Sequence, residues 1–209
     1  QQFRRVVGVN SMCFVSMALI LFLIMDPIGN ISPYLSLVGH LDRREQHKIV
    51  LREMLFALLV MIGFGYLGVY LFDFLGFSEI TVRVSSGVIL FLIAIKILFP
   101  SSDSLRAYLP PGEPKVFPIA IPLIAGPGLM ATLLLYGSID AYQSFMLPAI
   151  LTSWLAAVVI LYFSERIRNI LGANGLMAAE RLIGMVLVLI AVQRFLEGVL
   201  IFWKKGALM

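Results

Sequence analysis

The chain is poor in charge. Asp, Glu, Lys and Arg make up 13% of its 209 residues, whereas 60% are hydrophobic, and the mean hydropathy is +0.98. A soluble domain ordinarily carries about 25% charged and about 45–50% apolar residues. The composition therefore excludes an ordinary soluble domain and predicts an integral membrane protein built from helices.

Cysteine and histidine are also scarce. Cys13 is the single cysteine, and the two histidines, His40 and His47, lie in one polar loop. One cysteine excludes disulfides and cysteine-based metal clusters within the chain. Intramembrane enzymes need paired carboxylates, Ser/His pairs or metal ligands at depth, and no apolar span contains a histidine. We therefore expect no enzyme, no metal site and no cofactor.

The glycine-rich loop that binds phosphates in ATPases is absent too. ATP-driven transport would therefore need a separate subunit. The net charge of +4 does not indicate nucleic-acid binding, because the basic residues lie mainly in short loops between apolar segments.

Six apolar segments are long enough, at about 20 residues, to be candidate membrane crossings. They are Ser11–Val38, Met54–Phe72, Val84–Phe99, Val116–Gly137, Phe145–Phe163 and Leu182–Trp203. An even number places both termini on one side. The loops on the other side carry more Lys and Arg, including the run "HLDRREQHK", so the positive-inside rule predicts that this loop is cytoplasmic and that both termini lie outside.

Two of these segments contain residues that break helices. "LIMDPIGN" occupies residues 23–30, and "LIAGPGLM" occupies residues 123–130, at an offset of 100. Proline lacks an N–H and fits the first turn of a helix, and aspartate is a strong N-cap. We therefore predict a half-helix ending near Met25 and another starting at Pro27, with a matching break at Gly126–Gly128.

The two halves of the chain also resemble each other elsewhere. "GVILFLIAIK" (87–96) and "GMVLVLIAVQ" (184–193) align at an offset of 97. These matches predict a single transmembrane domain over residues 1–209, with repeat one at about 11–99, a cytoplasmic linker at about 100–115 and repeat two at about 116–203. Because each unit has three spans, the copies would enter the membrane from opposite sides, as an inverted-topology repeat.

Such symmetry brings the two breaks together near the middle of the membrane. A restarted helix presents free N–H groups and a positive dipole end, which suit a carboxylate, while Asp26 suits an ammonium group or a proton. We therefore predict a site for a small zwitterion at both breaks. Its residues would be Asp26, Pro27, Gly29, Asn30, Gly126, Pro127 and Gly128. The alternative is structural: Asp26 caps a half-helix, the glycines allow close packing, and Asn30 links helices.

Other charged residues fall inside or near spans. Arg194 and Glu197 are three apart in the sixth span and are expected to pair on one helix face, and Lys96 lies near the end of the third span. Snorkelling to the membrane surface and a role in gating or coupling are the alternatives for all three. Asp26 is read as the only acid deep in a span, which favours H⁺ over Na⁺ as the coupling ion.

The chain resembles the MarC family of six-span bacterial inner-membrane proteins. The resemblance rests on "MDPIGNISPYLSL", "PIAIPLIAGPGLMATLL", "RVSSGVILFLIAIKIL" and "RLIGMVLVLIAVQRFLEGV". It implies a multi-pass protein of the bacterial inner membrane that transports small neutral amino acids such as glycine and alanine. We therefore expect a secondary transporter, with a channel or exporter of another small solute, or a non-transporting scaffold, as alternatives. Its expected partners are a small zwitterionic solute and membrane lipids, and homo-oligomerisation is left open.

Overall fold

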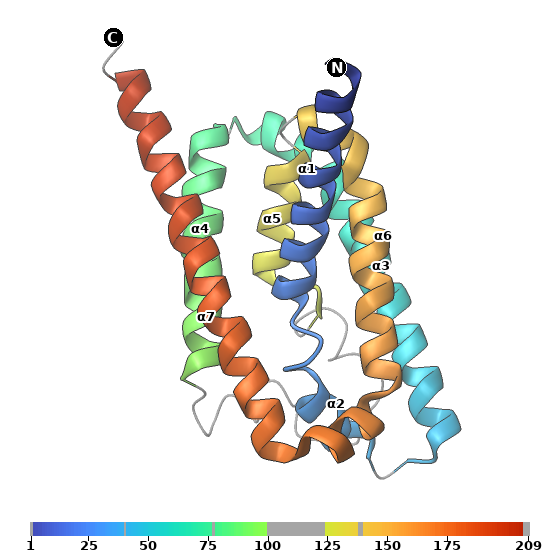
Figure 1. The fold of residues 1–209 in the computed structure, drawn as a ribbon. Helices are drawn as coiled ribbons and strands as arrows, with labels where there is room; N and C mark the ends of the chain where they lie inside the picture. Colours follow the sequence, from blue (N-terminus) through green and yellow to red (C-terminus); the bar gives the residue numbers. More distant parts are fainter. Residues whose placement is uncertain (1, 40, 77, 100–123, 138–139, 207–209) are drawn as a thin grey trace.

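The protein is a bundle of helices. The computed structural model describes residues 2–39, 41–76, 78–99, 124–137 and 140–206, and the predicted linker at 100–115 lies outside this part of the chain. The described helices are α1 (Gln2–Met25), α2 (Ile31–Val38), α3 (Arg43–Leu75), α4 (Glu79–Leu98), α5 (Pro127–Gly137), α6 (Asp140–Tyr162) and α7 (Ser164–Gly206). Figure 1 shows both termini at the same end of the bundle. The predicted all-α class is confirmed.

The helices suit a membrane. Four segments of the described chain are long and apolar enough to cross one: Arg43–Gly68, Ile80–Leu98, Gln143–Tyr162 and Ser164–Lys204. Shorter apolar helices occur at Phe14–Met25 and Gly128–Gly137, in the two segments predicted to be broken. Large apolar side chains such as Leu67, Phe74 and Leu189 are exposed on the outside of the bundle, a surface that lipid would cover. The chain is therefore a polytopic membrane protein.

The first break lies where the sequence predicts it, but it is longer. Helix α1 ends at Met25, because Pro27 has no N–H and its ring would clash with the carbonyl of the preceding turn. Asp26 follows with a φ of 41°, the one positive φ outside glycine among the described residues. The Asn30 N–H then donates to the Asp26 carbonyl at 3.0 Å, closing a separate turn. Helix α2 consequently begins at Ile31, and the prediction that it begins at Pro27 is wrong.

The second break also begins a helix. Helix α5 starts at Pro127, at the position where a missing N–H costs no hydrogen bond. The Gly126 carbonyl accepts the first intrahelical bond, from Met130 N–H at 3.1 Å. Residues 116–123 of the predicted fourth span lie outside the described residues. Within the described part, the restart predicted at Pro127 is confirmed.

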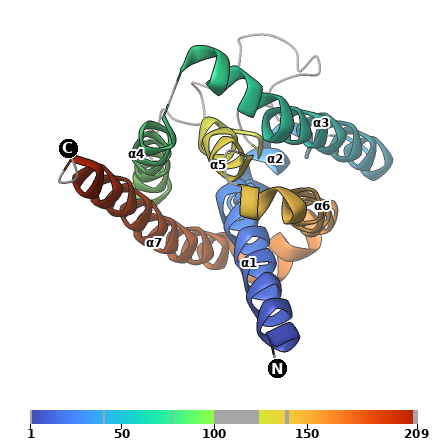
Figure 2. The ribbon, with the colours of Figure 1, turned by 90° about the horizontal axis from the view of Figure 1, so that it is seen from above.

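Glycines set how closely α4 and α7 approach. The two helices run side by side (Figures 1 and 2), and a Cβ added at Gly87 would lie 2.8 Å from the Phe195 backbone nitrogen and 3.0 Å from the Ala191 carbonyl oxygen. Any larger residue at Gly87 would push the helices apart. Gly87 therefore has a packing role in this pair of helices.

Helix α7 is longer than the predicted sixth span, which began at Leu182. It starts at Ser164 and contains a kink at Gly172, whose φ is 66° and ψ 177°. In Figure 1 the first part of α7 crosses the lower end of the bundle, and the remainder rises beside α4 to the C-terminal end. Residues between the kink and Leu182 therefore belong to the helix rather than to a loop.

The junction of the interrupted helices

Asp26 sits at the centre of the first break. Its side chain is only 9% exposed, and its Oδ1 accepts a hydrogen bond from the Gly29 N–H at 3.1 Å. A Cβ added at Gly29 would overlap the Asp26 carboxylate. The turn thus wraps around the carboxylate, and only glycine fits at position 29. This arrangement agrees with the structural role proposed for Asp26 as a local cap.

Asn30 closes the same break from the other side. Its Nδ2 donates to the Met25 carbonyl at 2.8 Å, so the side chain satisfies one of the last acceptors of α1. The residue is buried. Asn30 therefore links the end of α1 to the start of α2, which is the role of helix linker expected from the sequence. Contact with a solute stays a prediction.

The start of α5 lies against the end of α1. A Cβ added at Gly128 would lie 3.9 Å from Ile24 Cγ2 and 2.6 Å from Ile93 Cδ1 of α4. Figure 1 shows the lower ends of α1 and α5 side by side inside the bundle. We call this meeting point, formed by residues 24–30 and 126–128, the junction. The two interruptions lie together as predicted, whereas binding of a solute by them stays a prediction.

A second acid lies inside a span, on α7. Glu180 is half-buried and falls within Ser164–Lys204, one of the segments long and apolar enough to cross a membrane. The prediction that Asp26 is the only acid deep in a span is therefore wrong. The signal was present in the spacing: Leu176, Glu180 and Leu187 fall at positions i, i+4 and i+11, on one face of a helix. The predicted start at Leu182 hid this pattern.

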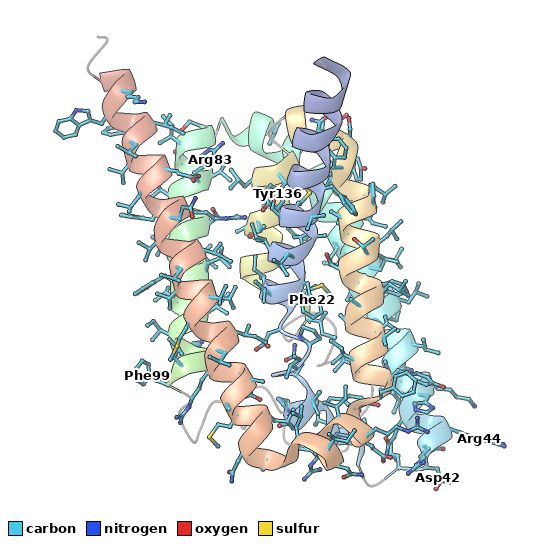
Figure 3. All side chains as sticks on the ribbon, in the orientation of Figure 1. Phe22, Asp42, Arg44, Arg83, Phe99 and Tyr136 are labelled. Atoms are coloured by element: carbon cyan, nitrogen blue, oxygen red, sulfur yellow. The ribbon has the colours of Figure 1, made fainter. Side chains whose placement is uncertain are left out.

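Arg194 lies on the same inner face of α7, farther up. Its side chain is 7% exposed. Its Nη1 donates to Thr132 Oγ1 at 3.2 Å and its Nη2 to the Tyr136 hydroxyl at 2.7 Å, both on α5. The guanidinium also lies over the Tyr136 ring, 5.1 Å from its centroid. Figure 3 places Tyr136 in the upper half of the bundle. Arg194 therefore points into the protein, and the snorkelling interpretation is wrong.

The predicted pair of Arg194 with Glu197 does not form. Glu197 instead forms an ion pair with Arg83 of α4, at 3.5 Å. It also accepts a hydrogen bond from the Gln193 side chain at 3.1 Å. A step of three residues turns the helix away from α5 and toward α4, so the two side chains diverge.

Lys96, the other residue predicted for gating or coupling, is exposed in the last turn of α4. That end of α4 lies at the lower end of the bundle, near the labelled Phe99 in Figure 3. The structure therefore brings neither Lys96 nor Glu197 to the junction.

A polar cavity of about 200 Å³ opens at the lower end of the bundle. Its lining includes Tyr34 of α2, whose hydroxyl donates to the Gln46 carbonyl at 3.0 Å, and the ion pair of Arg43 with Glu165 at 3.1 Å. Asp42 and Arg44, labelled in Figure 3, mark the same end. The sequence predicted only a polar loop there, because the cavity is completed by residues that follow α6.

These features define a class: a polytopic helical membrane protein in which two interrupted helices meet inside the bundle. Residues 11–202 match the model of the MarC family integral membrane proteins. The chain belongs to this family, and the resemblance noted in its sequence is confirmed.

The relatives are similar over nearly their whole length. The UPF0056 inner membrane protein YhgN of Escherichia coli is 43% identical over 194 residues, covering 92% of this chain and 98% of its own. A UPF0056 membrane protein of Buchnera aphidicola is 41% identical over 192 residues, covering 91% and 98%. One from Pyrococcus horikoshii is 28% identical over 190 residues, covering 90% and 92%. No solved structure matches the chain.

Proposed function

We propose that the protein is a secondary transporter of small neutral amino acids, of the glycine and alanine class, that binds its solute at the junction. The observation that carries this proposal is the meeting of two helix ends of opposite polarity inside the bundle. The C-terminal end of α1 carries partial negative charge, to which Asp26 adds a carboxylate, and the N-terminal end of α5 carries partial positive charge.

Such a pair of ends complements a zwitterion. The free N–H groups at the start of α5 suit the carboxylate of an amino acid, and Asp26 with the last carbonyls of α1 suits its ammonium group. Gly128 already approaches Ile24 and Ile93 closely, so little room remains for a solute side chain. The proposed solute is therefore small.

Two acids within spans suggest how transport is driven. Asp26 and Glu180 come from opposite halves of the chain, and carboxylates that lie near each other in a poorly solvated interior repel. A proton shared with either carboxylate would relieve the repulsion between them, and so would a bound ammonium group. We therefore propose H⁺ as the coupling ion, with Na⁺ as the competing choice.

The helix packing supports six crossings arranged as an inverted repeat. The two interrupted segments with the four long helices would make six. A two-fold relating the halves would exchange α1 with α5, α3 with α6 and α4 with α7. It would therefore convert the packing of α1 on α6 into that of α5 on α3, and both pairs are in contact. It would leave the pair α4 and α7 unchanged. We further propose that the termini are periplasmic in a bacterial inner membrane, and that the protein is no enzyme.

The test is transport by the purified protein in liposomes. Radiolabelled glycine and alanine should accumulate under an imposed proton gradient, saturably and with counterflow. Asp26→Asn should lower the uptake rate about tenfold or more, since a hydrogen bond to a charged group contributes about 1.5–3 kcal/mol. Asp42→Asn is the matched control, because it makes the same change at an exposed position and should leave uptake intact.

Other outcomes would point elsewhere. Flux that does not saturate and shows no counterflow would indicate a channel. A sodium gradient that replaces the proton gradient would reassign the coupling ion. Absence of transport or exchange of either amino acid under both gradients would overturn the proposal and leave the scaffold alternative.

A further inference from the structure

We propose that Arg194, Thr132 and Tyr136 form a second binding site, for the carboxylate group of a small monovalent anion, in the upper half of the bundle. This site is distinct from the junction and does not depend on the proposed transport of amino acids. It rests on the position of one buried positive charge and on the hydrogen-bond donors around it.

The charge of Arg194 is not neutralised within the described chain. Its side chain is 7% exposed, and its two hydrogen bonds go to hydroxyl groups, which carry no charge. The nearest acid along α7, Glu197, pairs with Arg83 instead. The contact with the Tyr136 ring is attractive but weaker than the cost of burying an ion without a counter-ion. A buried arginine in this state is a ready receptor for an anion.

Donors remain for such an anion. Guanidinium has five N–H groups in a planar fork, and those of Arg194 make two hydrogen bonds, both from its Nη atoms. No fully buried side-chain nitrogen or oxygen of the described residues lacks a partner, so the unbonded Nε of Arg194 must keep some accessible surface. An Nε–H beside an Nη–H matches the two oxygens of a carboxylate. This geometry selects a carboxylate over a spherical ion.

Thr132 adds a further donor. Its side chain is fully buried, and its hydroxyl accepts the bond from Arg194, which leaves the hydroxyl proton to donate. That proton has no acceptor among the described residues. Threonine and arginine thus offer converging donors to one point between α5 and α7.

The position of the site restricts the ligand. Helices α5 and α7 do not pack closely on each other, and the long Arg194 side chain bridges them, with α1 and α4 on either side in Figure 2. Arg194 lies ten residues before Lys204, which is about 15 Å along the helix. A lipid phosphate at the membrane surface is too far away to be the ligand. A small solute anion that enters the bundle fits.

The experiment titrates the detergent-solubilised full chain with sodium acetate, replacing chloride at constant ionic strength. Trp154 and Trp203 supply the fluorescence signal for thermal unfolding. Acetate should raise the unfolding temperature saturably. Arg194→Gln should weaken the apparent affinity for acetate at least tenfold, whereas Arg181→Gln, an exposed arginine on the same helix, should leave it unchanged.

Two further variants keep the test decisive. Thr132→Val keeps the charge and the shape, and should weaken acetate binding several-fold even if Arg194→Gln fails to fold. Asp26→Asn should bind acetate like the wild type, which separates this site from the junction. Acetate stabilisation that is absent, that persists in Arg194→Gln, or that is unaffected by Thr132→Val would overturn the proposal. Stronger stabilisation by chloride would overturn the assignment to a carboxylate.

Discussion

Gly29→Ala tests whether the turn at the first break holds the Asp26 carboxylate in place. The added Cβ would occupy the space of that carboxylate, which accepts the Gly29 N–H at 3.1 Å. The turn cannot open easily, because Asn30 is bonded at both its backbone and its side chain. The Asp26 side chain must therefore rotate and give up its bond.

The magnitude follows from that lost bond. A hydrogen bond to a charged group contributes about 1.5–3 kcal/mol. Replacing glycine by alanine also stabilises the folded protein by about 0.4–1 kcal/mol, because it lowers the conformational entropy of the unfolded chain. The net loss is about 1–2 kcal/mol, which lowers the unfolding temperature of a chain of this size by about 2–8 °C. Glycine uptake should fall as well, because the carboxylate no longer faces the junction.

The assay compares Gly29→Ala with Gly63→Ala by thermal unfolding in detergent and by uptake in liposomes. A Cβ at Gly63 meets nothing within 4 Å, so this control gains helix propensity at no steric cost and should be at least as stable as the wild type. If Gly29→Ala unfolds at the temperature of Gly63→Ala and transports normally, the turn does not position Asp26.

Three further changes probe packing and charge, each by thermal unfolding. Gly87→Ala should cost about 1–3 kcal/mol, because the added carbon meets the backbone of α7, and unfolding like the wild type would contradict the close approach of α4 and α7. Trp154→Phe removes the Nε1–H that donates to the Met54 carbonyl at 2.7 Å and should cost about 1 kcal/mol. Glu180→Gln should raise the free energy of unfolding of the wild type more than that of the Asp26→Asn variant, with a coupling energy of about 0.5–3 kcal/mol between the two sites. If the effects of the two substitutions simply add, Asp26 and Glu180 do not interact.

The breaks could be predicted because their causes are local. Pro27 and Pro127 each lack an N–H and lie close to glycine, so the local sequence favours an interruption at both positions without knowledge of the fold. Proline alone does not decide this, since α6 continues through Pro148. The restart at Ile31 could not be predicted from the same rule. It depends on Asp26 adopting a positive φ and on Asn30 reaching back to Met25, which are properties of the closed turn.

The surroundings of Arg194 and Glu180 could not be predicted in the same way. Spacing along α7 identifies partners on that helix, such as Glu197, but the partners of Arg194 lie 58 and 62 residues earlier, on α5. Glu180 was missed because hydropathy marks where a span becomes apolar and not where its helix begins. Helix α7 begins at Ser164, well before that point.

The two halves, which we propose to be related by a two-fold, carry an asymmetric set of charges. The first half supplies Asp26 at its break, whereas the second supplies no acid at its own break and places Glu180 and Arg194 on α7 instead. Glu180 and Arg194 are 14 residues apart, or about 21 Å along the helix, so the acid and the arginine of α7 lie at different depths of the bundle. A symmetric pair of halves would present the same chemistry to both sides of a membrane. In the transport that we propose, a solute with both an ammonium and a carboxylate group would therefore meet the acid and the arginine at different depths, in a fixed order.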